Sequence, residues 1–160
     1  MEHGPVAEIA AGLHGQVAIS SAKVAYQIYQ EIFSGERFRK LAQMGARPQR
    51  LLWESTGTKN PEYSDIKYIE TLIGRETINT IPPETLNAYR DHGKPISQLE
   101  EGTQEAYHVL DALSQAGVDL DASTQELEDE GVTKFSQAFG KLTTALQEKR
   151  AASLIDPVKP

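Results

Sequence analysis

The chain has 160 residues, 39% hydrophobic and 24% charged, which is typical of one globular domain with a sizeable core. Its net charge of −7 opposes binding to a polyphosphate backbone, so we expect no nucleic-acid partner. The absence of cysteine excludes disulfides and thiolate metal sites, and the sequence has neither a basic secretory leader nor an apolar run long enough to span a membrane. We therefore expect a cytoplasmic protein without a membrane partner.

Residues 1–46 form a helical lead-in. Apolar residues recur there at the spacing of an amphipathic helix, with Gly35 as its end. The stripe consists of Val17, Val24, Ile28 and Ile32. A second, shorter helix is predicted over residues 36–44 and stops at Gly45.

Residues 47–93 alternate between strand and helix patterns. Leu51-Leu52-Trp53 is a compact apolar run that predicts a short buried strand. A helix follows over residues 64–73, with Ser64 as its N-cap, and the β-branched run at residues 77–81 predicts a second strand. Pro83 then suits the first turn of a helix that ends at Gly93. This order predicts a parallel pair of strands with crossover helices.

Residues 94–152 show helix patterns only. One helix ends at Gly117, a short acidic helix ends at Gly131, and a third helix carries a clean apolar stripe. That stripe consists of Phe135, Phe139, Leu142 and Leu146. Residues 153–160 are predicted to be a loose tail, and residues 1–160 together a single partial domain.

Two strands are too few for a sheet that buries both faces. A closed eight-stranded α/β barrel takes about 250 residues, so this chain cannot hold one. Further strands in the first fifty residues would conflict with the helical stripe found there. We therefore favour a piece of a larger sheet, whose exposed strand edges would also permit self-association.

The loop after the first strand is the best candidate for a ligand site. It contains Ser55, Thr56, Gly57 and Lys59, and it follows the carboxyl end of a strand, where α/β folds place their ligands. Hydroxyl groups, accessible backbone N–H groups and one ammonium group suit a phosphate. The alternative is a glycine-containing surface turn with a solvated lysine. The loop is not a Walker motif, because the glycine spacing is wrong.

Two other patterns give weaker evidence for a functional site. Ser20-Ser21-Ala22-Lys23 matches Ser-x-x-Lys, but it lies inside a helix and lacks the companion motifs, so we interpret it as coincidence. The four histidines lack metal-ligand spacing, so no metal site is expected.

Residues 45–93, GARPQRLLWESTGTKNPEYSDIKYIETLIGRETINTIPPETLNAYRDHG, resemble the C-terminal portion of the long bacterial branch of the transaldolases. The preceding GQVAISSAKVAYQIYQEIF and the later EDEGVTKF fit the same family, so the resemblance runs from about Ala7 to Glu148. It implies part of a (β/α)8 barrel and transfer of a dihydroxyacetone unit between sugar phosphates, such as fructose 6-phosphate, in the pentose phosphate pathway. It implies no cofactor, because a lysine Schiff base acts as the electron sink.

In this resemblance, residues 50–55 and 77–81 correspond to the last two barrel strands. Ser55 matches a serine near the substrate phosphate, and Lys59 lies near the place of a phosphate-binding arginine, two residues displaced. Glu54 departs from the small residue usual in the family.

The Schiff-base lysine and the proton-handling acids belong to a part of the family that this chain does not include, so no catalytic residue is expected within it. The lysines at positions 23, 40 and 67 lie on helices or linkers and do not replace it. Two alternatives stay open. One is a non-catalytic, oligomerising or partner-binding module derived from the fold, and the other is a different enzyme that re-uses the phosphate loop.

Overall fold

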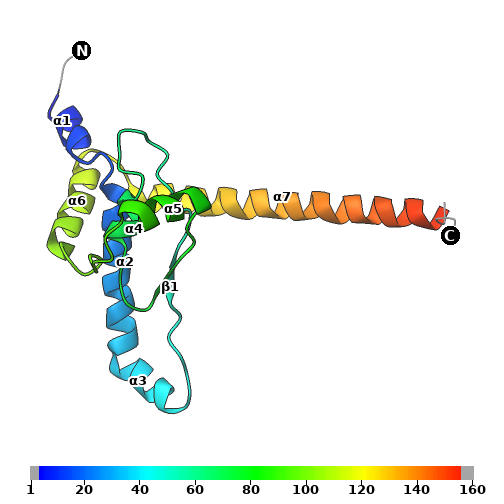
Figure 1. Cartoon of the computed structure of the whole chain (residues 1–160), viewed down its shortest axis with the longest axis horizontal. Helices are drawn as coiled ribbons and strands as arrows, with labels where there is room; N and C mark the ends of the chain where they lie inside the picture. Colours follow the sequence, from blue (N-terminus) through cyan, green and yellow to red (C-terminus); the bar gives the residue numbers. More distant parts are fainter. Residues whose placement is uncertain (1–3, 156–160) are drawn as a thin grey trace. The chain divides into compact units, whose positions relative to one another are not determined.

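A computed structural model describes residues 4–155 of the chain. Residues 156–160, which belong to the predicted tail, lie outside the described part. The described chain divides into two compact units, one ending at Gly117 and the other beginning at Val118. It is mostly helical, as predicted (Figure 1). The elements are α1 (Pro5–Gly12), α2 (Val17–Ser34), α3 (Glu36–Gln43), β1 (Leu51–Trp53), α4 (Lys67–Thr71), β2 (Thr77–Asn79), α5 (Pro83–His92), α6 (Thr103–Gln115) and α7 (Leu120–Ile155).

The two helices expected between Val17 and Met44 are present as α2 and α3. The apolar stripe makes α2 a long helix, and Gly35 lies between its end and the start of α3. Three aromatic contacts run along α2 and onto α3: Tyr26 stacks on Tyr29, Tyr29 contacts Phe33, and the Phe33 ring meets the edge of Phe38 at 4.7 Å between centroids. These contacts fix α3 against the end of α2.

The two strands pair in parallel, as the alternating pattern predicts. Leu51 lies opposite Thr77, Leu52 opposite Ile78, and Trp53 opposite Asn79. Because side chains alternate across a strand, the two faces of this small sheet differ. Leu51 and Trp53 pack against the core, whereas Leu52 and Ile78 are 50% and 37% exposed on the other face. The prediction of a buried strand is therefore wrong for Leu52, which would need a further layer above it.

The core lies between α2 and the segments that flank the sheet. It is built from Tyr26, Tyr29, Leu72 and Leu99, and Leu99 is fully buried. The backbone of Leu99 is held by a hydrogen bond from its N–H to the carbonyl of Ile73, at 3.1 Å. Helix α6 packs along α2, with the ammonium group of Lys23 donating to the carbonyl of Glu101 at 2.6 Å.

One helix and one strand differ from the prediction. The helix expected over residues 64–73 is only one turn of α4, and Ile66 rather than Ser64 precedes it. The Ser64 hydroxyl accepts a hydrogen bond from the Ile66 N–H at 3.4 Å, so it stabilises a turn in front of the helix instead of capping it. The second strand is also shorter than predicted and ends at Asn79.

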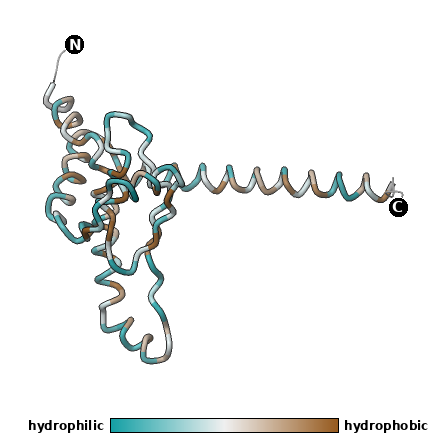
Figure 2. Tube along the Cα trace, in the orientation of Figure 1, coloured by the Kyte–Doolittle hydropathy of each residue, from teal (hydrophilic) through white to brown (hydrophobic). Residues whose placement is uncertain are grey.

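In the unit that begins at Val118, residues 120–155 form one continuous helix, α7, along which hydrophobic and hydrophilic residues are interspersed (Figure 2). The prediction that a short acidic helix ends at Gly131 is wrong, because α7 continues through that residue. An interior glycine costs about 1 kcal/mol relative to alanine, which is too little to end the helix. Among the described residues, no helix combines the length and the apolarity that crossing a bilayer requires.

Candidate functional site

The carboxyl ends of β1 and β2 are joined by side-chain and backbone contacts. The hydroxyl of Thr56, which is 5% exposed, donates to the side-chain oxygen of Asn79 at 2.7 Å. At the residue after Asn79, the Thr80 N–H donates to the carbonyl of Trp53 at 2.9 Å. The chain therefore leaves both strands at one edge with fixed relative positions, and this edge is where parallel α/β sheets bind ligands.

A cavity of about 280 Å³ opens at this edge. Its walls come from the end of β1, from the residues that follow it, and from α2 and α4. The polar part of the lining consists of Glu54, Ser55, Thr56 and Tyr68, and the indole of Trp53 lies beside them. Three hydroxyl-bearing residues thus line one cavity, which is large enough for part of a phosphorylated sugar.

Ser55 has a left-handed backbone conformation, with φ of 55°. Such a conformation is uncommon for residues other than glycine, asparagine and aspartate, and it costs on the order of 1 kcal/mol. It turns the chain sharply where β1 ends, so that the exposed Ser55 and the buried Thr56 both line the cavity. This strain lies at the position that the sequence analysis selected.

The other two predicted site residues lie outside the cavity lining. A side-chain carbon added at Gly57 would come within 3.1 Å of Pro82 and 3.2 Å of the Thr85 hydroxyl, so glycine allows the loop to approach the start of α5 closely. Lys59 is exposed and makes no hydrogen bond or ion pair among residues 4–155. The structure thus brings Ser55 and Thr56 together and does not add Gly57 or Lys59 to them.

The charge at the cavity is negative. Glu54 is the one charged residue in its lining, and the three lysines at positions 23, 40 and 67 point elsewhere. Lys23 donates to a carbonyl of the loop before α6, Lys40 pairs with Glu36 at 2.8 Å, and Lys67 lies 3.7 Å from the ring centroid of Tyr63. An anion held here therefore depends on hydroxyl and N–H donors and on cations from outside the lining.

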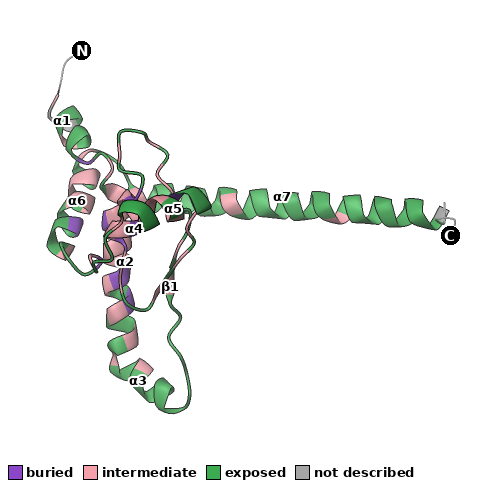
Figure 3. Ribbon diagram, in the orientation of Figure 1, coloured by how far each residue is buried: buried purple, intermediate pink, exposed green. Residues whose placement is uncertain are grey.

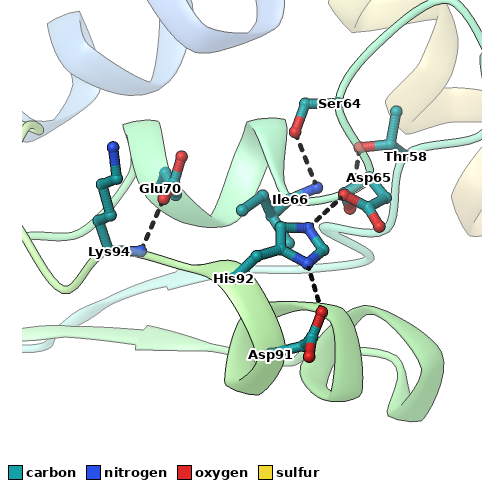
Figure 4. Close-up of polar contacts among 8 residues, drawn as sticks. All are labelled: Thr58, Ser64, Asp65, Ile66, Glu70, Asp91, His92 and Lys94. Atoms are coloured by element: carbon teal, nitrogen blue, oxygen red, sulfur yellow. Dashed lines mark hydrogen bonds and ion pairs between the residues drawn. The ribbon is translucent and has the colours of Figure 1, made fainter.

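The loop between β1 and α4 is tied to the end of α5 (Figure 4). The Thr58 hydroxyl donates to the backbone carbonyl of Asp65, at 3.4 Å. The Asp65 carboxylate lies 3.0 Å from His92 Nε2, and the carboxylate of Asp91 lies 3.2 Å from His92 Nδ1. The hydrogen bond with Asp65, and next that with Asp91, raise the pKa of His92 above its usual 6.5. His92 thus lies between two carboxylates beside the loop.

Sequence reasoning missed two residues at this edge. Asn79 lies in the middle of the predicted strand at residues 77–81 but is the last residue of β2. A polar residue at the carboxyl end of a strand is a signal, and a prediction that ended the strand there would have selected it. Tyr68 gave no such signal, because it lies off the apolar face formed by Ile66, Ile69 and Leu72. The cavity also contains the indole of Trp53, whose buried N–H has no hydrogen-bond partner within residues 4–155.

Residues 4–146 match the model of the family described as Transaldolase/Fructose-6-phosphate aldolase. A transaldolase from Thiobacillus denitrificans is 53% identical over 130 residues, which is 81% of this chain and 36% of the relative. The relative named Transaldolase 2 in Nostoc sp. is 43% identical over 146 residues, covering 90% of the chain and 38% of the relative. A transaldolase from Saccharopolyspora erythraea is 43% identical over 138 residues, covering 86% and 38%.

The chain thus spans little more than a third of the length of the curated relatives that it matches. The family match nevertheless covers most of the chain, including both strands and the loop with Ser55. The chain belongs to the transaldolase/fructose-6-phosphate aldolase family.

Proposed function

We propose that this chain supplies the phosphate end of the sugar-phosphate site in a transaldolase. The reaction is transfer of a dihydroxyacetone unit between sugar phosphates such as fructose 6-phosphate. The observation that carries the proposal is that Ser55 and Thr56 both line a cavity at the carboxyl end of β1, which pairs in parallel with β2. Family membership supplies the class of reaction.

In this proposal, β1 and β2 are the last two strands of a (β/α)8 barrel, and residues 47–93 form the barrel segment of one partial domain. Two observations support it. The face that carries Leu52 and Ile78 is exposed, as expected for residues that would face the interior of a closed barrel. Each strand also has one edge without a partner strand among the described residues, at which further strands could pair.

The four predicted residues have separate roles in the proposal. Ser55 donates its hydroxyl to a phosphate oxygen, and Thr56 holds the cavity wall through Asn79. Gly57 lets the loop lie against α5, which keeps its backbone N–H groups near the ligand. Lys59 contributes a point charge from the rim, which offsets the carboxylate of Glu54.

The bond-breaking step needs a lysine that this chain does not supply. Its amine condenses with the ketose carbonyl, releasing water, and the resulting iminium accepts the electron pair of the broken carbon–carbon bond. No cofactor takes part. Lys23, Lys40 and Lys67 are engaged with a carbonyl, a carboxylate and an aromatic ring, respectively. We further propose a cytoplasmic location, which suits a chain without cysteine.

A non-catalytic module that self-associates through its strand edges is the alternative that we weighed. The exposed Leu52 and Ile78 would suit it equally well. The family match across residues 4–146 favours the transaldolase proposal, since it extends over the loop as well as the helices.

A chimera tests the proposed site. Residues 4–146 replace the matching segment of the Thiobacillus denitrificans transaldolase, and the KM for fructose 6-phosphate is measured. Because a hydrogen bond to a charged group contributes about 1.5–3 kcal/mol, Lys59→Ala and Ser55→Ala should each raise KM by roughly tenfold or more.

Lys40→Ala is the matched control, because Lys40 is 72% exposed and pairs with Glu36 within α3. Its KM should stay unchanged. Equal KM values for the chimera and its three variants would show that the loop does not contact the substrate.

A further inference from the structure

Helix α7 carries an apolar face that has no partner within its own unit, of which residues 118–155 are described. Phe135 and Phe139 are 81% and 71% exposed, and the helix is exposed along nearly its whole length (Figure 3). The face consists of Val132, Phe135, Phe139, Leu142 and Leu146, whose spacing of three and four residues is that of the seam of a coiled coil. Most of the stability of a helix comes from packing of such a face, so this spacing indicates a helical partner.

Small residues flank this seam on one side. Gly131, Ala138, Ala145 and Ala152 recur every seven residues, and the first three immediately precede Val132, Phe139 and Leu146. In a heptad these are the positions that border the seam and face the partner helix. Since nothing larger than a methyl group stands there, a second helix can approach closely on that side.

Charge is segregated along α7. Its first eleven residues hold five carboxylates and no cation, whereas Lys134, Lys141, Lys149 and Arg150 follow with Glu148 as the single acid. A parallel pair of such helices would align acid with acid and base with base. An antiparallel pair would align the acidic end of each helix with the basic end of the other.

We propose that α7 pairs antiparallel with α7 of a second copy of this chain. In the register that sets Phe139 of one copy against Leu142 of the other, Phe135 lies against Leu146. The same register places Asp129 opposite Arg150 at both ends of the pair, and Ala138 opposite Ala145 near its centre. The apolar pattern, the small residues and the charge distribution are therefore all consistent with this one antiparallel register. This inference does not rest on the proposed enzymatic function.

Sedimentation equilibrium of the full chain tests the partner. A dimer is expected, with a dissociation constant that Asp129→Arg or Arg150→Asp each raises by roughly tenfold, since each single change creates two like-charged pairs. The double variant Asp129→Arg/Arg150→Asp restores the original value, because it exchanges the charges within each pair. Gln137→Arg, which adds a charge opposite the seam, is the matched control and should leave the constant unchanged.

Cross-linking tests the orientation. The natural chain has no cysteine, so introduced thiols are the only ones present. Equal amounts of Ala138→Cys and Ala145→Cys chains should form mixed dimers with a short bis-maleimide, whereas Ala138→Cys alone should cross-link poorly. Ala151→Cys, on the outer face, is the control and should not react. A chain that stays monomeric, or one that cross-links best through Ala138→Cys alone, would overturn the antiparallel pair.

Discussion

His92 is the described side chain whose ionisation is most clearly linked to structure. It lies between the carboxylates of Asp65 and Asp91, and both hydrogen bonds raise its pKa (Figure 4). Because the folded pKa exceeds the ordinary value, the contribution of His92 to stability is complete below about pH 6.5 and is lost as the pH rises through the folded pKa. The link between the loop after β1 and the end of α5 should therefore be strongest in mild acid.

Nuclear magnetic resonance titration of the His92 imidazole, in wild type and two carboxylate variants, measures this effect. Asp65→Asn should lower the pKa of His92 more than Asp91→Asn does, because the hydrogen bond with Asp65 is the largest cause of the rise. The melting temperatures should differ in the same way. Near pH 6 the wild type should melt at a higher temperature than Asp65→Asn, and the two temperatures should converge well above the folded pKa of His92. Identical titration curves for the three proteins would show that His92 stands free in solution.

At the scale of elements, two glycines should respond in opposite directions to alanine. An added carbon at Gly74 would lie 2.5 Å from one methyl group of Leu99 and 2.8 Å from its Cβ, and Leu99 is fully buried. Gly74→Ala should therefore destabilise the first unit by about 1–3 kcal/mol through overpacking. Gly140 lies inside α7 with nothing within 4 Å, so Gly140→Ala should stabilise that helix by about 1 kcal/mol.

Urea unfolding followed by circular dichroism gives the change in free energy of unfolding for Gly74→Ala and for Gly140→Ala. The two variants serve as controls for each other. Two changes of the same sign would contradict the packing around Gly74 or the continuity of α7. Gly140 lies off the seam of α7, so its replacement leaves the proposed pairing face intact.

Local sequence patterns predicted which helices and strands form more accurately than they predicted where those elements end. The long stripe of α2, the proline at the start of α5 and the parallel order of the strands are confirmed. The failures have physical causes. Serine and threonine hydroxyls compete for backbone groups around Ser64, which shortened α4, and interior glycine is only mildly unfavourable, which let α7 pass Gly131.

At the scale of the whole molecule, the sequence could select two residues of the candidate cavity but not all of its lining. Ser55 and Thr56 follow a strand, so position in the fold identified them, and the structure gathers both at one cavity. Tyr68 enters that cavity from a helix turn whose orientation depends on tertiary packing, which no local pattern encodes. Whether a strand is covered on both faces is also a property of the whole sheet, and for this reason the half-exposed Leu52 was predicted to be buried.

The central claim is that this chain contributes the phosphate end of a transaldolase site and takes its nucleophile from elsewhere. Intact-mass spectrometry after borohydride reduction with fructose 6-phosphate tests it most directly. The chain is mixed with the portion of the Thiobacillus denitrificans transaldolase that it does not match, and each component is also treated alone. We predict a reduced ketose-phosphate adduct on the added portion, only when both components are present. An adduct on this chain, or equal labelling of the added portion without it, would contradict the claim.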